Sequence, residues 1–206
     1  MGGERPNIHS YYGVEAEDYG RSKWMKRNQQ KTTKRAIVLL LSEKLGSDLQ
    51  LIPEEQMFLE IGCGTGYSTE VLILNGFRTI GIEISPDMIS QADISYHKDA
   101  HLIMADMRNL PLREAQCDHC ISISAFNFAS EGGSTEKDFY EGIDKSVQEL
   151  HRELKSKGRA VIEFYPTEEE QKAFLSSLKH HSFEGGLLIE NQDTRKEKKY
   201  LLLKKQ

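Results

Sequence analysis

Residues 57–66 read MFLEIGCGTG and join a short apolar run to a loop with three glycines. The run has the length of a buried strand. Gly62, Gly64 and Gly66 permit a tight turn and let a ligand approach the backbone amides. Because residues 67–74 continue with helical spacing, the stretch predicts a strand, a glycine loop and a helix, which together form one wall of a nucleotide-type pocket.

The most informative side chain in this stretch is Glu60, at the carboxyl end of the predicted strand. A dinucleotide fold lays a pyrophosphate on such a loop, and a carboxylate there would repel it. The dinucleotide fingerprint also requires a third glycine where Tyr67 stands. S-adenosylmethionine meets neither objection, because it carries an ammonium and a sulfonium and no phosphate. We therefore expect S-adenosylmethionine as the cofactor.

The composition is that of a soluble globular protein, with 206 residues of which 29% are charged and 38% hydrophobic. This length suits one globular unit. We divide it into an N-terminal helical segment that caps the cofactor site, 1–45, and a cofactor-binding domain, 46–206. The longest aliphatic run, 36–41, is too short to span a bilayer, and residues 1–10 lack the apolar stretch of a secretory signal. We expect an intracellular protein, either cytoplasmic or, in a eukaryote, nuclear.

Three cysteines in a chain of this length indicate no disulfide framework and a reducing compartment. Cys117 and Cys120 form a lone C-x-x-C. A zinc site needs more ligands at metal-type spacing, and the sequence has no second pair. We therefore expect no metal site.

A basic run interrupts a chain whose net charge of −5 argues against a generic nucleic-acid binder. Between Arg21 and Arg35 there are seven basic residues and no acid. On a helix, these side chains spread over about half of the circumference. The face either binds phosphates, with Lys26 and Arg27 as candidate substrate-binding residues, or is merely solvated. The sequence favours neither explanation over the other.

The rest of the chain alternates between predicted strands and helices. The expected strands are 57–61, 78–84, 101–105, 117–124, 159–165, 187–191 and 199–203. The expected helices are 15–45 with a break near residue 20, 66–75, 85–92, 137–155 and 168–180. This alternation predicts an α/β fold of the Rossmann type, a seven-stranded, mostly parallel sheet with helices on both faces and an antiparallel hairpin at one edge.

Ligands of such sheets bind at the carboxyl ends of the strands. Glu83 ends the second predicted strand 17 residues after Gly66, where a carboxylate can hold two ribose hydroxyls. Asp106 follows the third strand and could accept a hydrogen bond from the adenine amine, with Met107 against the ring. The fourth strand ends in the sequence ISISAF, and we expect residues 122–125 to pass beneath the methyl donor.

Three motifs resemble successive motifs of the class I S-adenosylmethionine-dependent methyltransferases: EIGCGTG at 60–66, EISPDM at 83–88 and ADM at 105–107. A narrower resemblance spans nearly the whole chain and depends on YYGVEAEDY at 11–19, ISISAFNF at 121–128, IEFYP at 162–166 and FEGGLLIENQ at 183–192. These segments stand in the order found in the small-subunit (18S) ribosomal RNA guanine-N7 methyltransferases of ribosome biogenesis. The resemblance implies the same fold, cofactor and reaction.

The resemblance also implies roles for individual residues. The implied cofactor-binding residues are Tyr19, Glu60, Gly62, Cys63, Gly64, Gly66, Glu83, Ile84, Met88, Asp106, Met107 and Ser122. Within this set, Glu60 is expected near the cofactor's ammonium, Glu83 on the ribose and Ser122 at the cofactor's inner edge. Tyr12 and Tyr19 are expected to close over the cofactor.

The family further implies a partner, a small zinc-binding activator protein that pairs with the edge strand 101–105. The apolar side chains of that strand would otherwise favour aggregation. The chain departs from the group at Glu83, which replaces an aspartate, and at Asn127, which stands where a glutamine is usual. Family members also carry a basic tail after the last strand, whereas this chain stops at Gln206, so we do not infer a nuclear location from the family.

No catalytic acid or base is assigned, because guanine N7 already bears a lone pair at neutral pH and catalysis can rest on positioning and electrostatics. Phe126 and Asn127 are expected to face the substrate. Phe126 is a candidate for stacking on an extruded base, although core packing explains it equally well. Two alternatives stay open, a small-molecule methyltransferase of the same fold and a non-catalytic ribosome assembly factor that binds the cofactor.

Overall fold

The computed structural model describes residues 7–46, 52–93 and 100–206, and these form a seven-stranded sheet in the order β3-β2-β1-β4-β5-β7-β6. The strands are β1 (Met57–Ile61), β2 (Arg78–Glu83), β3 (Ala100–Met104), β4 (Cys117–Ile123), β5 (Leu154–Phe164), β6 (Phe183–Glu190) and β7 (Lys198–Lys205). β1 to β5 run parallel, whereas β7 is antiparallel to both β5 and β6. The predicted mostly parallel sheet with an antiparallel edge hairpin is confirmed.

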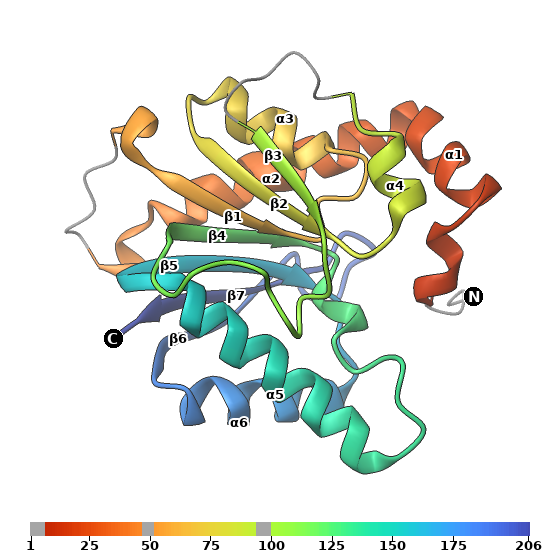
Figure 1. The fold of residues 1–206 in the computed structure, drawn as a ribbon. Coiled ribbons are helices and arrows are strands. Elements are labelled where there is room, and N and C mark those ends of the chain that lie inside the picture. Colours follow the sequence, from red (N-terminus) through yellow and green to blue (C-terminus); the bar gives the residue numbers. More distant parts are fainter. Residues whose placement is uncertain (1–6, 47–51, 94–99) are drawn as a thin grey trace.

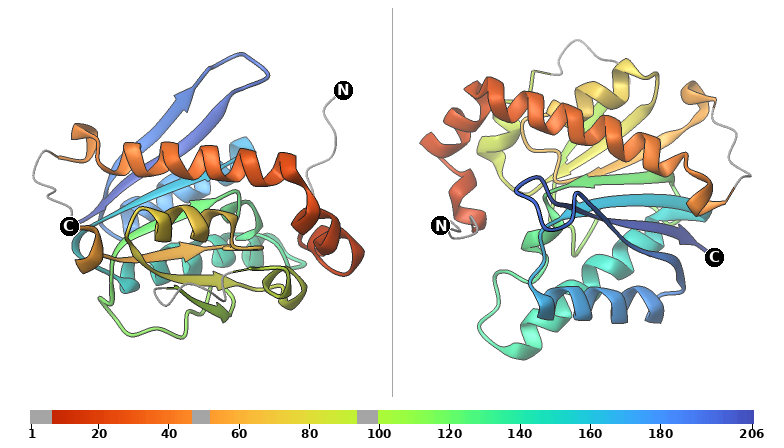
Figure 2. Two further views of the ribbon diagram at one scale, coloured as in Figure 1. Left: turned by 90° about the horizontal axis from the view of Figure 1, so that it is seen from above. Right: turned by 180° about the vertical axis from the view of Figure 1, so that it is seen from behind.

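Helices cover both faces of this sheet (Figure 1). The α-helices are α1 (Val14–Arg21), α2 (Lys23–Leu40), α3 (Tyr67–Leu74), α4 (Pro86–Ser90), α5 (Glu136–Glu153) and α6 (Glu168–His180). Short 3-10 turns occur at Ile8–Tyr11, Glu43–Leu45, Pro53–Glu55 and Phe126–Phe128. α5 and α6 lie on one face, and α2 and α3 lie on the other (Figures 1 and 2). Within the described residues, no helix is both long and apolar enough to cross a membrane.

The expected helix over 15–45 is two helices, and the break expected near residue 20 lies at Ser22. The Ser22 hydroxyl accepts a hydrogen bond from the Met25 amide and so caps α2. This cap satisfies one of the backbone amides that the start of a helix leaves without an intrahelical partner. α2 then stops at Leu40.

The expected helix over 137–155 is also shorter than predicted, because β5 begins directly after it at Leu154. Leu154 pairs with Cys117, and a register shift follows before Arg159 pairs with His119. Similarly, β6 begins at Phe183 instead of 187, since its first residues pair with the end of β7. Long-range strand pairing, which local pattern does not reveal, set both boundaries.

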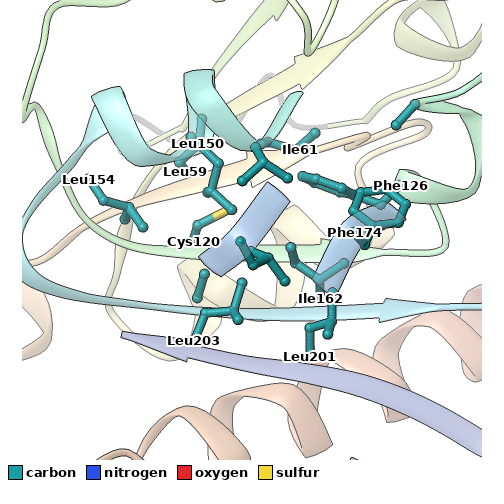
Figure 3. Packing of buried hydrophobic residues seen from close by; sticks show 14 of the residues in the cluster. Leu59, Ile61, Cys120, Phe126, Leu150, Leu154, Ile162, Phe174, Leu201 and Leu203 are labelled. Carbon is teal, nitrogen blue, oxygen red and sulfur yellow. The ribbon is translucent and has the colours of Figure 1, made fainter. Parts of the chain in front are cut away.

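Two apolar cores lie on the two faces of the sheet. One joins the strands to α5 and α6, and Figure 3 shows part of it around Ile162, Phe126 and Phe174. The other joins the strands to α2 and α3. Because the sheet is held from both sides, the carboxyl ends of its parallel strands are fixed at one edge, and the strand order reverses there between β1 and β4.

Candidate active site

A cavity of about 900 Å³, its open mouth included, lies at the carboxyl ends of the strands around this reversal. Nine of the predicted cofactor residues line it: Tyr19, Gly62, Cys63, Gly64, Glu83, Ile84, Met88, Asp106 and Met107. Three do not. Gly66 lines an adjoining hollow, and Glu60 and Ser122 are buried behind the lining. The strand-end motifs, far apart in sequence, therefore meet around one cavity.

The glycine loop brings the backbone of β1 close to the end of β4. Gly62 has φ +76°, and a Cβ at this position would overlap the Cβ of Ala125. The amides of Gly62 and Cys63 both donate to the Ile82 carbonyl, at 2.7 and 3.0 Å. Only glycine fits this turn, and the close approach leaves the loop backbone exposed to the cavity.

Glu83 ties the glycine loop to the end of β2. One carboxylate oxygen accepts from the Gly64 amide at 3.0 Å, and the other accepts from the amides of Ile84 and Ser85 at 3.0 and 2.9 Å. Burial raises the pKa of Glu83 above its ordinary value, although these three amides oppose the shift. The carboxylate is held rigidly, and the oxygen that accepts from Gly64 keeps a lone pair for a ribose hydroxyl.

Glu60 is placed differently from the expectation that it lies beside the cofactor. It is 1% exposed and accepts a hydrogen bond of 2.5 Å from the Thr69 hydroxyl on α3. Burial raises its pKa to about 8, with the Thr69 bond acting in the opposite direction, so near neutral pH the group is mainly protonated. The carboxylates that line the cavity are Glu83 and Asp106. These two groups, rather than Glu60, would repel a pyrophosphate.

Asp106 is held by the side chain that follows it two residues later. Arg108 donates to it from its amide at 2.8 Å and from Nη2 at 2.6 Å. Burial alone would raise the pKa of Asp106, but the Arg108 contacts outweigh it and lower the pKa. Arg108 also donates to the Glu131 carbonyl at 2.7 Å. Asp106 is thus a fixed negative charge at the cavity wall.

The N-terminal segment forms part of the cavity wall through Tyr11 and Tyr19. It is fastened to α4, because the Ser85 hydroxyl donates to the Tyr11 carbonyl at 2.7 Å and the Gly13 amide donates to Asp87 at 2.8 Å. Tyr12 does not line the cavity. Tyr11, its neighbour, takes the position for which the sequence suggested Tyr12.

Ser122, expected at the cofactor's inner edge, lies within the sheet, where its hydroxyl donates to the Ile61 carbonyl at 2.8 Å. The serine of β4 that reaches the cavity is Ser124, two residues further on. Ser124 has a left-handed backbone with φ +61°, which is unusual for a residue other than glycine. The strand end is therefore bent so that this hydroxyl turns toward β5.

A buried carboxylate, Glu163, holds this bend. It is 0% exposed and accepts hydrogen bonds of 2.7 Å from Ser124 Oγ, from the Tyr165 hydroxyl and from Lys198 Nζ. Asn127 completes the arrangement, because its Oδ1 accepts from the Tyr165 amide at 2.7 Å and its Nδ2 donates to the Ser124 carbonyl at 3.0 Å. We call these five residues the Glu163 network. Ser124 belongs to the segment 122–125 that was expected beneath the methyl donor, and it lines the cavity. Asn127, expected to face the substrate, is instead buried and does not line the cavity. Glu163, Tyr165 and Lys198 were not predicted, although IEFYP was among the segments that carried the family resemblance.

Phe126 points into the core rather than toward the cavity. It is 1% exposed, and its ring centroid lies 5.8 Å from that of Phe174 on α6 (Figure 3). Of the two explanations offered for Phe126, the structure favours core packing. The phenylalanine of this segment that lines the cavity is Phe128, edge-on to Tyr11 at 5.6 Å.

Thr65, in the glycine loop, was also missed. Its hydroxyl is buried, lines the cavity and has no hydrogen-bond partner among the described residues. A buried hydroxyl without a partner is costly unless a ligand supplies one. Together with the rigid Glu83 carboxylate and the open loop backbone, it fits a ligand such as S-adenosylmethionine, whose carboxylate can accept and whose ribose can donate.

Lys26 and Arg27 lie outside the cavity. Lys26 forms an ion pair of 2.8 Å with Glu70 and stands 5.6 Å from the centre of the Tyr67 ring, over its face. Arg27 is exposed on α2. The two candidates therefore differ, because Lys26 already has a carboxylate partner and Arg27 faces solvent.

Comparison with known proteins agrees with this geometry. A family model described as a methyltransferase domain matches residues 59–162. The 18S rRNA (guanine-N(7))-methyltransferase of Schizosaccharomyces pombe is 30% identical over 195 residues, which cover 94% of this chain and 69% of that relative.

Solved structures with low sequence identity show the same fold. A geranyl diphosphate C-methyltransferase from Streptomyces coelicolor, in complex with S-adenosyl-L-homocysteine, aligns with a TM-score of 0.66 at 11% identity, over 98% of this chain and 86% of that one. A complex between the Haloferax volcanii Trm112 methyltransferase activator and a methyltransferase aligns with a TM-score of 0.57 at 15% identity, over 93% of this chain and 98% of that one. The chain belongs to the 18S rRNA (guanine-N(7))-methyltransferase family of S-adenosylmethionine-dependent methyltransferases.

Proposed function

We propose that this protein transfers a methyl group from S-adenosylmethionine to N7 of a guanine in small-subunit ribosomal RNA. The observation that carries the proposal is the convergence on one cavity of the glycine loop, Glu83 and Ser124, the last held by the Glu163 network, in a chain of this family. This role would place the protein where small ribosomal subunits are made, in the nucleus or cytoplasm.

The residues of the cavity divide the work of holding the cofactor. The loop amides and the Thr65 hydroxyl would bind the methionine part, and the Glu83 carboxylate would accept from the ribose hydroxyls. Ile84 and Met107 would flank the adenine, with Asp106 toward its amine. We also propose that Tyr11 and Tyr19 close over the bound cofactor, which makes the N-terminal segment a cap.

S-adenosylmethionine supplies an electrophilic methyl group on a sulfonium. The attacking guanine nitrogen needs no deprotonation, so the protein's part is to position the base and to exclude water. Ser124, held by the Glu163 network, forms the wall nearest the end of β4, and Phe128 offers an apolar face beside it. Asn127 is buried behind this wall and donates to the Ser124 carbonyl. We therefore propose this half of the cavity as the place where the base is held.

The test is direct. Small-subunit ribosomal RNA is incubated with methyl-labelled cofactor and the protein, with and without a zinc-binding activator protein, and the label is mapped by cleavage specific for N7-methylguanine. Label at one guanine, reduced with Glu83→Ala at limiting cofactor, supports the proposal. Transfer to a small molecule instead of RNA, or cofactor binding without any transfer, would support one of the two alternative functions and would overturn it.

We propose that the activator pairs with β3. β3 is an edge of the sheet and is hydrogen-bonded to β2, and Met104 on it is 63% exposed. An apolar edge strand with open backbone groups suits strand addition by a partner. The family resemblance and the Haloferax volcanii complex, in which a methyltransferase of this fold binds an activator, are in keeping with this proposal.

This site can be tested with two matched variants. Met104→Lys places a charge on the β3 edge, and Ile189→Lys places the same charge on β6, the opposite edge, where Ile189 is 37% exposed. We expect only Met104→Lys to abolish co-purification with the activator. Equal binding by both variants would exclude the β3 edge as the partner's site.

A further inference from the structure

A stripe of basic residues follows the outer side of α2, away from the sheet. It consists of Lys23, Arg27, Lys31 and Lys34, all exposed. At 3.6 residues per turn, these positions and Trp24 fall within an arc of about 100°. The buried residues of α2 lie on the opposite side and face the strands, and Figure 2 shows the helix lying across the outside of the sheet. We call this surface the α2 stripe.

The α2 stripe is the unneutralised part of the basic run. The other three basic residues of the segment have carboxylate partners, in the pairs Arg21–Glu17, Lys26–Glu70 and Arg35–Glu190. Among residues 7–46, 52–93 and 100–206, no ion pair involves a residue of the stripe. Since the chain carries −5 and the seven basic residues of this segment carry +7, the remaining residues carry −12. A positive band on an acidic protein complements a polyanion.

Trp24 extends this surface with an aromatic ring. It is 66% exposed and is the single tryptophan of the chain. Most of its ring contributes nothing to the core, and cations beside an open aromatic ring are what proteins use to hold single-stranded nucleic acid, with phosphates on the cations and bases on the ring. A surface that binds only another protein would be expected to carry fewer unpaired charges.

The local sequence also works against helix stability here. The first turn of α2 contains no acidic residue, whereas Lys23, Lys26 and Arg27 stand near the positive end of the helix dipole. Such a conflict between local preference and structure is expected where a surface serves a function. Because Lys26 is paired with Glu70, the uncompensated part of this charge lies on the stripe.

The stripe begins next to the cofactor cavity. Lys23 lines the hollow that adjoins the cavity, and the two share Thr65 and Tyr67 in their linings. We propose that the α2 stripe and Trp24 bind a single-stranded segment of the substrate RNA close to the nucleotide that is methylated, with the indole stacked on a base. The inference rests on the proposed function, because it assumes an RNA substrate.

Trp24 provides its own probe, since its fluorescence is the only indole emission of the chain. The full-length protein is titrated with a short single-stranded oligoribonucleotide, and we expect the emission to change in proportion to binding. With labelled RNA, Trp24→Ala should weaken binding by about 5- to 150-fold, the range for one stacked base, whereas Trp24→Phe should retain most of the affinity.

The charge of the stripe is tested with a matched pair of double variants. Arg27→Glu with Lys31→Glu reverses two stripe residues, and Lys172→Glu with Lys179→Glu makes the same change of net charge on the exposed side of α6. The first should reduce the slope of log affinity against log salt by about 1.4, for two lost phosphate contacts on a single strand. The second should leave that slope close to the wild-type value.

Equal slopes in the two double variants, or an indole emission that ignores saturating RNA, would overturn the proposal. An emission that instead changes with protein concentration alone would assign the surface to a second copy of the chain and would also overturn it. If the stripe variants lose RNA binding but the wild type transfers no methyl group, the proposed function is wrong and the assignment of the α2 stripe to RNA binding is kept. If the wild type and the stripe variants methylate RNA with equal KM, only the assignment of the α2 stripe to RNA binding is wrong.

Discussion

The two halves of the cavity are built in different ways. The cofactor half consists of contiguous motifs in which backbone amides do most of the work, as at Gly64 and Glu83. The half at the ends of β4 and β5 depends on side chains from three strands, because Ser124, Glu163 and Lys198 meet only in the folded sheet. Backbone sites can be encoded by a short stretch of sequence, whereas the Glu163 network needs the antiparallel β7 to bring its lysine into place.

The largest expected effect is on the network side. Glu163→Ala leaves Lys198, 24% exposed, without its carboxylate partner and removes the acceptor of the Ser124 hydroxyl. We expect the free energy of unfolding to fall by about 3 kcal/mol, because removing one partner of a buried ion pair leaves the other charge unpaired. Urea denaturation measures this loss. Glu163→Gln, which keeps an acceptor oxygen, should lose less, and in folded Glu163→Gln protein the affinity for the cofactor should be unchanged while RNA methylation drops.

A second prediction concerns the pH dependence of stability that Glu60 causes. Glu60 keeps its proton up to about pH 8 in the folded chain, whereas its ordinary pKa is 4.5. The folded state therefore binds the extra proton within this window, and Glu60 makes stability fall as pH rises from 4.5 to 8, by about 1.4 kcal/mol per pH unit at most. Below 4.5 its contribution is complete.

The variant Glu60→Gln has no titrating group at this position, so this decrease in stability with rising pH should be missing. Urea denaturation of the wild type and the variant at several pH values across the window measures the difference between them. Parallel curves would show that the carboxylate is ionised in the folded protein. In that case Glu60 would return as a candidate partner for the cofactor's ammonium.

Glu83→Ala comes next in size. It removes the acceptor proposed for the ribose, and we expect cofactor affinity to fall by about 1.5–3 kcal/mol, the range for hydrogen bonds to a charged group. Titration calorimetry with S-adenosylmethionine measures it. Affinity for single-stranded RNA should stay at the wild-type value, because Glu83 lies on the cofactor half. An unchanged cofactor affinity would refute the ribose assignment.

The smallest expected effect concerns the Thr65 hydroxyl, which is buried without a partner. Thr65→Val should raise the melting temperature of the cofactor-free protein slightly, because it removes an unsatisfied polar group. The same variant should weaken cofactor binding by about 1 kcal/mol, because the hydroxyl would pair with the cofactor. A higher melting temperature together with a lower cofactor affinity would show that the hydroxyl serves the cofactor. A loss of stability without loss of affinity would mean that the hydroxyl serves the fold alone.

Much of the fold could be predicted because its signals are local. The apolar run before Gly62 and the start of a helix at residue 85 are encoded within a few residues, and the structure has β1 and, capped by Ser85, α4 at these places. The ends of α5 and of β6 could not be predicted, since pairing of Leu154 with Cys117 and of Phe183 with Lys205 decides them. The roles of Phe126 and Ser122 were misjudged for a related reason, because a helix and a strand distant in sequence decide where these side chains lie. Phe126 packs against Phe174 on α6, and Ser122 donates to the Ile61 carbonyl of β1.

The sequence by itself determined the strand, the glycine loop, the helix and the acid at the end of β2, because each of these depends on neighbours along the chain. Only the tertiary structure decided that Glu60 is buried on Thr69, that Glu83 faces the cavity and that Glu163 gathers Ser124, Tyr165 and Lys198. The physical reason is burial. Whether a carboxylate is charged, and what it can hold, depends on the solvent and the donors around it, and these come from parts of the chain that are distant in sequence.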